Sequence, residues 1–267
     1  MKTSGRVLAE KIDKVQADAR FQVRSNALPI WCPGCGYFGI HFAINECIRR
    51  LGRPLHQVVV VSGIGCAGRY PFFSATYGLH TVHGRTLPVA TGLKLANPEL
   101  TVFAVGGDGD GLGIGGGHLP HAARRDIDIN YVLFDNSIYG LTKGQPSPSS
   151  PVGFTTKASP QGTVDQPLNA SLLALAYGAG FVARGFAGDV DGMAEELLAG
   201  VNHPGFAIFH MYSSCVTFDK SFKTWKNLKA RVKPVSPEHD RHDRQAALNL
   251  ALTDEDSMGI LYERPPA

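Results

Sequence analysis

The first residues that could do chemistry lie in a glycine-rich stretch, GGDGDGLGIGGG, which carries Asp108 and Asp110. Two carboxylates beside a phosphate would repel it unless a divalent cation lies between them. Mg²⁺ takes about six oxygen ligands in an octahedral array. The sequence can supply three of them: the Asp108 carboxylate, the Asn136 side-chain oxygen and a backbone carbonyl just beyond it, most simply that of Ile138. The stretch therefore predicts a magnesium site that holds a diphosphate.

The same stretch is also compatible with a dinucleotide site. Gly111, Gly113 and Gly116 satisfy the pattern G-x-G-x-x-G. Asp135 follows about 20 residues later, where a dinucleotide-binding fold places the acid that binds the ribose. The two acidic residues in the loop speak against this alternative, because they would face a pyrophosphate without a bridging ion. A set of glycine turns that binds no ligand is a third interpretation.

The cysteines suggest a second kind of site. The C-x-x-C pair Cys32 and Cys35 is compatible with a redox dithiol, half of a zinc site or part of an iron–sulfur site. The pair precedes the first clear strand, which disfavours a thioredoxin-like dithiol, and the absence of a second C-x-x-C disfavours a zinc ribbon. Cys66 and Cys215 each follow a predicted strand, so four thiolates could meet at one edge of a sheet and ligate a [4Fe–4S] cluster. Cys47 lies on the apolar face of a predicted helix and is expected to be a buried structural thiol.

Taken together, the motifs WCPGCG, GIGCAGR, HGR, GDGD and DNSIYGLTKGQ and the late cysteine resemble the β subunit of 2-oxoacid:ferredoxin oxidoreductases. The resemblance covers about residues 25–220 and is greatest to the 2-oxoglutarate enzymes. It implies a subunit that binds thiamine diphosphate, Mg²⁺ and a [4Fe–4S] cluster. The complex would oxidise 2-oxoglutarate with coenzyme A to succinyl-CoA and CO₂ and reduce ferredoxin, or run in reverse. The pyruvate enzyme is the alternative within the family. An NAD-dependent Rossmann oxidoreductase and a non-catalytic, metal-stabilised binding subunit are the alternatives of other classes.

The resemblance also implies which residues hold each group. The cluster ligands would be Cys32, Cys35, Cys66 and Cys215, and the magnesium ligands Asp108, Asn136 and the Ile138 carbonyl. The residues expected to contact thiamine diphosphate are Ile64, Gly65, Cys66, Ala67, Gly109, Asp110, Gly140 and Leu141.

Other parts of the site are expected to come from elsewhere. Thiamine enzymes use a glutamate of a separate pyrimidine-binding domain, and this chain has room for one nucleotide-type domain. Glu46 lies off the apolar face of its helix, so we expect the catalytic glutamate from a partner α subunit. Arg69 is the first candidate for binding a substrate carboxylate, because it follows Cys66 by three residues and is expected to point into the same site. Arg85 and, further off, Lys143 are the other candidates, and His83 is one for a polar contact to substrate or cofactor. Structural roles remain open for each of them.

These residues require a scaffold that brings distant loops together. Solid apolar runs at 57–61, 101–105, 129–134, 181–184 and 205–211 predict strands, which alternate with predicted helices at 39–51, 86–96, 118–126, 169–178 and 190–202. This pattern predicts an α/β fold with a doubly wound, mostly parallel sheet. Ligands bind beyond the carboxyl ends of such strands, where the polar loops 62–69, 106–117, 135–142 and 212–219 lie. A weak helix is expected over 6–24 and an irregular stretch over 143–168.

Length and composition set the limits of these interpretations. The chain has 267 residues, of which 43% are hydrophobic and 18% charged, a balance typical of globular proteins. We expect an N-terminal extension (1–28), a thiamine diphosphate-binding domain with the iron–sulfur site (29–219) and an irregular C-terminal tail (220–267). A net charge of +3 is too small to indicate nucleic-acid binding. The charged N-terminus and the absence of a long apolar run argue against secretion and membrane insertion, so a cytoplasmic location is expected. The basic segment 220–233 could dock an acidic ferredoxin or be a solvated surface.

Overall fold

The structure, a computed structural model, describes residues 23–266. Its centre is an eight-stranded sheet with the strand order β2-β1-β3-β4-β8-β7-β10-β9. Neighbouring strands are parallel in the part β2-β1-β3-β4-β8-β7 of this order. Strand β10 pairs with β7 in the antiparallel direction. The strands of this sheet are β1 (Val58–Ser62), β2 (Tyr77–His80), β3 (Thr101–Gly107), β4 (Asn130–Asp135), β7 (Phe181–Phe186), β8 (Ala207–Tyr212), β9 (Lys233–Pro234) and β10 (Ser257–Glu263).

Apolar side chains cover both faces of the sheet, because its central strands consist almost entirely of apolar residues. Successive residues of a strand point to opposite faces. In β1, Val58 and Val60 therefore join one core cluster, whereas Val59 and Val61 join the other. Each face of the sheet consequently needs its own layer of helices.

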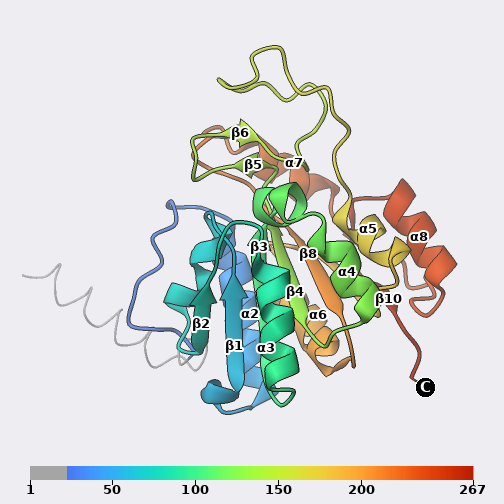
Figure 1. Ribbon diagram of the computed structural model, residues 1–267. Helices are drawn as coiled ribbons and strands as arrows, with labels where there is room; N and C mark the ends of the chain where they lie inside the picture. Colours follow the sequence, from blue (N-terminus) through green and yellow to red (C-terminus); the bar gives the residue numbers. More distant parts are fainter. Residues whose placement is uncertain (1–22, 267) are drawn as a thin grey trace, which may run out of the picture.

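The helices form these two layers (Figure 1). Helices α2 and α6 pack together over one core cluster, and α3, α4, α5 and α8 cover the other. In α2 the buried residues Ile40, Ile44 and Ile48 form one stripe, and Gly52 ends the helix in the left-handed conformation with φ 66°. The helices are α2 (Tyr37–Leu51), α3 (Thr86–Ala96), α4 (His118–Arg125), α5 (Ala170–Ala176), α6 (Val190–Asn202), α7 (Lys223–Arg231) and α8 (Arg244–Thr253).

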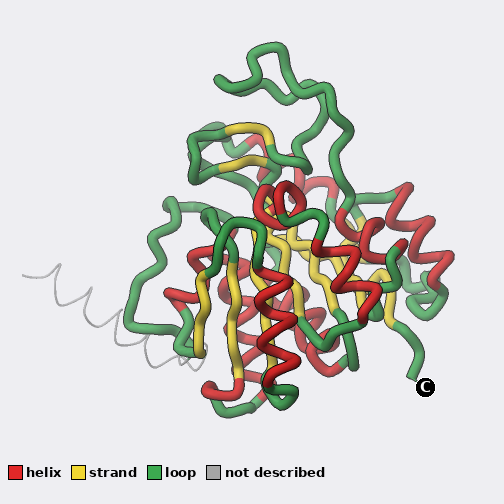
Figure 2. The backbone as a smooth tube through the Cα atoms, viewed as in Figure 1, coloured by secondary structure: helices red, strands yellow, loops and turns green. Residues whose placement is uncertain are grey.

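Loops and short elements gather above one edge of the sheet, at the carboxyl ends of its parallel strands (Figure 2). A 3₁₀ helix (Ala67–Phe73) follows β1, and a wide, π-type helical turn (Gly109–Ile114) follows β3. A two-stranded hairpin of β5 (Ile138–Tyr139) and β6 (Gln145–Pro146) follows β4. This is the edge where the expected site residues lie.

The expected α/β class, with a doubly wound and mostly parallel sheet, is confirmed. The predicted strands and helices between 39 and 211 are all present, with ends shifted by a few residues. Strand β2 was not expected, because its side chains are exposed and carry no apolar pattern. The expected helix over 6–24 falls almost entirely on residues 1–22, outside the described part of the chain. Within residues 23–266 no helix is long and apolar enough to cross a membrane. The cytoplasmic location stays a prediction.

The C-terminal segment is more regular than the irregular extension expected from its sequence. It contains α7, α8 and β10, and β10 extends the main sheet. The apolar pattern of α8 is weak because its buried contacts come from small side chains, Ala247 and Ala251, which let it pack closely on α5. Asp243 caps this helix by accepting hydrogen bonds from the backbone amides of Gln245 and Ala246. Whether the chain divides at residue 219 stays a prediction.

Candidate active site

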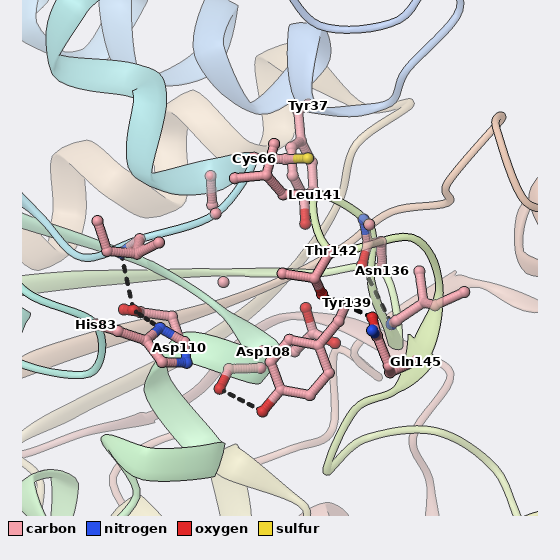
Figure 3. Close-up of a pocket in the computed structure, with 17 residues that line it drawn as sticks. Tyr37, Cys66, His83, Asp108, Asp110, Asn136, Tyr139, Leu141, Thr142 and Gln145 are labelled. Carbon is pink, nitrogen blue, oxygen red and sulfur yellow. Dashed lines mark hydrogen bonds and ion pairs between the residues drawn. The ribbon is translucent and has the colours of Figure 1, made fainter. Parts of the chain in front are cut away.

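A pocket of about 510 Å³ opens at the carboxyl ends of β1, β3 and β4 (Figure 3). Its walls come from the loops that follow these strands and from the loop before α3. The expected residues that line it are Ile64, Gly65, Cys66, Ala67, His83, Asp108, Gly109, Asp110, Asn136, Ile138, Gly140 and Leu141. The structure thus brings together every residue expected to contact the cofactor or the magnesium ion.

Asp110 holds three of these loops together. Its Oδ1 accepts hydrogen bonds from the backbone amides of Ile64 (2.9 Å) and Gly84 (2.8 Å). The same oxygen lies 2.8 Å from His83 Nδ1 (Figure 3). The carboxylate is 2% exposed, and a side chain at Gly63 would collide with it. A buried carboxylate needs such donors to replace water. Asp110 therefore acts as a clamp, meaning that its carboxylate links the loops after β1 and β3 and the loop before α3. The sequence suggested only a contact to the cofactor for this residue.

Asp108 and Asn136 enter the same pocket from the ends of neighbouring strands, β3 and β4. Asp108 is 2% exposed, and its Oδ2 accepts a hydrogen bond from Ser149 Oγ at 3.2 Å. Burial and then the nearby Asp135 raise the pKa of the Asp108 carboxyl to about 8. A bound cation would offset both effects and favour the carboxylate. The donor set of a carboxylate, an amide oxygen and the Ile138 carbonyl fits Mg²⁺, a hard cation that prefers oxygen.

Asp135 lies behind this site and does not line the pocket. Its Oδ2 is 2.7 Å from His210 Nε2, and its Oδ1 accepts hydrogen bonds from Ser149 Oγ (2.7 Å) and the Ser137 amide (2.9 Å). Burial opposes ionisation, but the hydrogen bonds, first the one from His210, lower the pKa of Asp135 below its usual value. A carboxylate used in this way is not available to a ribose, so the geometry does not favour the dinucleotide alternative.

The thiols other than Cys47 lie near one another beside the pocket. A Cβ atom at Gly140 would lie 3.5 Å from Cys66 Sγ and 3.7 Å from Cys215 Sγ. Cys32 Sγ shares a hydrogen bond with Thr217 Oγ1 at 3.0 Å. Burial, and then the proximity of Cys215, Cys66 and Cys32, raises the pKa of the Cys35 thiol to about 12. A cationic iron centre would supply the positive charge that these buried thiolates need.

These four thiols are neighbours rather than a closed ligand set. Among residues 23–266, no three His, Cys, Asp or Glu side chains already form a group that could hold a metal ion. Cys66 links the two parts of the site, because it also lines the pocket. Cys47 is fully buried in α2, as expected, and burial raises the pKa of its thiol to about 12.

The chain is similar to known proteins over most of its length. Residues 55–211 match the family described as "Thiamine pyrophosphate enzyme, C-terminal TPP binding domain", and residues 215–267 match the family of the C-terminal part of the pyruvate ferredoxin oxidoreductase beta subunit. The chain is 44% identical over 213 residues to a 2-oxoacid:ferredoxin oxidoreductase subunit beta from Sulfolobus, which covers 79% of this chain and 70% of that protein. This chain belongs to the 2-oxoacid:ferredoxin oxidoreductase β-subunit family.

Two further relatives carry the name of the 2-oxoglutarate enzyme. The 2-oxoglutarate oxidoreductase subunit KorB of Mycobacterium tuberculosis is 45% identical over 210 residues, which is 78% of this chain and 56% of that protein. The match therefore spans little more than half of that relative. The solved 2-oxoglutarate:ferredoxin oxidoreductase from Magnetococcus marinus superimposes with a TM-score of 0.89 at 41% identity. That match covers 93% of this chain and 86% of the solved one, whose structure holds 2-oxoglutarate, coenzyme A and succinyl-CoA.

The basic residues expected to bind substrate take different places in this β subunit. Arg69 lies close enough to Cys66 for its charge to oppose the rise in the pKa of that thiol, but it does not line the pocket. Arg85 donates weakly to the carbonyls of Gly84 and Ile114 and lines an adjoining cavity that shares Ile64 and His83 with the pocket. Lys143 is exposed in the turn between β5 and β6. Of these three, Arg85 is the best placed.

Other pocket residues were not identified from the sequence. Tyr37, Gly107, Tyr139, Thr142 and Gln145 also line the pocket. The Tyr139 hydroxyl donates to the Gly109 carbonyl at 2.9 Å, and its ring occupies the space that a side chain at Gly109 would need. Tyr139 belongs to the motif DNSIYGLTKGQ, so its position beside the turn was a usable signal. Thr142 and Gln145 depend on the path of the β5–β6 hairpin, whereas Tyr37 begins α2 and Gly107 ends β3.

Proposed function

We propose that this chain is the β subunit of an oxidoreductase that uses thiamine diphosphate, Mg²⁺ and a [4Fe–4S] cluster. It would convert 2-oxoglutarate and coenzyme A to succinyl-CoA and CO₂ and pass two electrons to ferredoxin, or run in reverse. The observation that carries this proposal is one pocket that joins the oxygen ligands of Asp108 and Asn136 to Cys66. A diphosphate site and an electron-accepting site can therefore lie side by side.

In this proposal, Asp108, Asn136 and the Ile138 carbonyl would hold Mg²⁺, which would supply the positive charge that a diphosphate needs beside these carboxylates. The buried Asp108 carboxyl, whose pKa is raised to about 8, supports a cation at this position. With thiamine diphosphate bound, the available chemistry is decarboxylation of a 2-oxoacid with the cofactor as electron sink. The Tyr139–Gly109 hydrogen bond would keep the wide turn after β3 in place beneath the diphosphate.

The cluster would be held by Cys32, Cys35, Cys66 and Cys215. Its nearness to the cofactor follows from Cys66, which lines the pocket, and from Gly140, which lies beside two of the sulfurs. Helix α7 and the residues before it pack beside the loop that carries the first pair of thiols. Phe222 lies 3.5 Å from the Cβ position of Gly34, between Cys32 and Cys35. Cys32 is exposed and Cys35 is half-buried, so solvent exposure would be one of the factors that set the potential of the cluster.

The substrate requires groups beyond this chain's pocket. Among residues 23–266, no glutamate, lysine or arginine lines it. The catalytic glutamate is therefore assigned to a partner α subunit, which would close the open side of the pocket. The second carboxylate of 2-oxoglutarate would be bound by Arg85 from the adjoining cavity or by the partner. Coenzyme A would enter from the same side.

The electron acceptor is assigned to the basic face of α7. Lys220, Lys223, Lys226 and Lys229 are exposed, and none forms an ion pair within residues 23–266. Trp225, on the same helix, lies 3.2 Å from the Cβ position of Gly36. Because α7 closely follows Cys215 and packs beside the Cys32–Cys35 loop, an acidic ferredoxin docked there would lie close to the proposed cluster.

The decisive experiment uses the anaerobically purified complex of this chain with its α subunit. We expect a brown protein that reduces ferredoxin when 2-oxoglutarate and coenzyme A are both present, with a higher kcat/KM than for pyruvate. A preference for pyruvate would assign the chain to the other branch of the family. A colourless protein, or reduction of NAD instead of ferredoxin, would overturn the proposal.

A further inference from the structure

A chain of buried polar groups runs from the C-terminal segment to the proposed magnesium site. Arg184, which is 0% exposed, donates to the Asp254 and Ala251 carbonyls and, through Nε, to Ser171 Oγ at 3.3 Å. Ser171 Oγ lies 3.5 Å from His210 Nδ1. His210 Nε2 then contacts Asp135 Oδ2 at 2.7 Å. Such a polar series inside a core is costly unless every member is satisfied.

The donors of this series can all point in one direction. The Arg184 Nε–H group donates to Ser171, so the Ser171 hydroxyl is free to donate to His210 Nδ1. His210 then carries its proton on Nε2 and donates it to Asp135. The direction matters because Ser149 has a single hydroxyl hydrogen for two carboxylates, Asp135 at 2.7 Å and Asp108 at 3.2 Å. When His210 donates to Asp135, Asp135 depends less on the hydrogen bond from Ser149. The Ser149 hydroxyl can then donate to Asp108.

Asp135 shapes the turn that carries two of the proposed magnesium ligands. Its Oδ1 accepts the Ser137 amide at 2.9 Å, which closes a local turn around Asn136. Ser137 itself has φ 56°, a left-handed conformation that a residue other than glycine adopts only when its surroundings hold it. Ser150 Oγ adds a hydrogen bond to the Ser137 carbonyl at 2.6 Å. Both Asn136 and the Ile138 carbonyl therefore depend on the orientation of the Asp135 carboxylate.

We propose that His210 is a positioning residue for the magnesium–diphosphate site, acting through Asp135 on the turn of Asn136 and Ile138 and through Ser149 on Asp108. This inference rests on the proposed function, because it presupposes that the three oxygen ligands bind Mg²⁺. The His210 and Asp135 side chains are 3% and 2% exposed, and both also border a second cavity of about 400 Å³. Partners behind metal ligands typically contribute about 10–100-fold to metal affinity.

The test compares three replacements of His210 in the complex with the α subunit. His210→Gln places an amide N–H near the position of Nε2, whereas His210→Leu removes the donor at similar volume and His210→Asn is polar but too short. Calorimetric titration with Mg²⁺ at saturating thiamine diphosphate measures the metal affinity, and Tm is recorded separately. We expect a loss of about 10–100-fold for the Leu and Asn variants and near wild-type affinity for the Gln variant.

His203→Leu is the matched control. His203 is another buried histidine, but it lies after α6 at the opposite end of the sheet. This control is expected to lower Tm without changing the affinity for Mg²⁺. The inference is wrong if His210→Leu behaves in the same way. If His210→Leu does not fold, an Asn variant with the affinity of the Gln variant overturns the inference. Failure of the wild-type complex to bind thiamine diphosphate with Mg²⁺ overturns the proposed function instead.

Discussion

Replacing Asp110 by Asn tests whether this residue is a clamp or a cofactor contact. The Asn side-chain oxygen can still accept from Ile64, Gly84 and His83, so the geometry can persist while the charge is lost. Hydrogen bonds to a charged group contribute about 1.5–3 kcal/mol each, against about 0.5–1.5 kcal/mol between neutral groups. With three such donors at 2.8–2.9 Å, the change should cost about 3 kcal/mol of the free energy of unfolding.

Urea denaturation of the full chain without cofactor measures this cost directly. Asp165→Asn is the control, because Asp165 is exposed and forms no hydrogen bond or ion pair within the described residues. The control should leave the free energy of unfolding within about 0.5 kcal/mol of the wild-type value. A stable Asp110→Asn variant that has lost only its affinity for thiamine diphosphate would refute the clamp and restore the direct contact.

Four further outcomes follow from the site and the core. Replacing any of the four neighbouring thiols by Ala should lower the iron content of the complex, whereas Cys47→Ala should retain full iron and lose only stability. Asp108→Ala should abolish Mg²⁺-dependent binding of thiamine diphosphate in calorimetry. Arg85→Met should raise KM for 2-oxoglutarate by about 10-fold or more while changing KM for pyruvate much less, since a charged hydrogen bond is worth about 1.5–3 kcal/mol; equal losses would assign it a structural role. Burial and then Asp189 raise the pKa of Glu196 well above its usual value, so the folded chain holds a proton that the unfolded chain releases. Stability should therefore fall as pH rises above the ordinary glutamate pKa, by about 1.4 kcal/mol per pH unit until the raised pKa is reached. Glu196→Gln should remove this slope in Tm measured against pH.

The parts of the fold that the sequence predicts well are those in which one signal dominates. Strand β1 is a solid apolar run because both of its faces are covered, and a glycine-rich loop follows it. Helix α3 was predicted with its observed ends, 86–96. Strand β10 was missed for the opposite reason. It pairs with β7 in the antiparallel direction, has only the two-residue β9 beyond it, and contains several half-buried residues, so neither a solid run nor a clear alternation marks it.

The site shows the same distinction between local motifs and distant contacts. Loops that follow parallel strands lie together at the carboxyl ends of those strands, whatever the details of side-chain packing. Asp108, Asn136 and Cys66 each follow such a strand, so their positions along the chain were enough to place them together. Which side of a loop a carboxylate faces is decided by donors from other loops. The hydrogen bonds that Asp110 accepts could not be predicted, because Ile64 and Gly84 contribute only backbone amides, which no side-chain pattern marks.

His210 is the clearest case of a contact that no motif marks. In the sequence it is one histidine within an apolar strand, and it had no partner pattern that would distinguish it from a structural residue. Its importance depends on β4 and β8 being neighbours in register, which places Asp135 beside Tyr212 and Leu133 beside His210. In this register His210, two residues before Tyr212 and on the same face of β8, can reach the Asp135 carboxylate. The order and register of the strands therefore decide which residues support the turn of Asn136. A search for sequence motifs alone finds the proposed magnesium ligands but not the residues behind them.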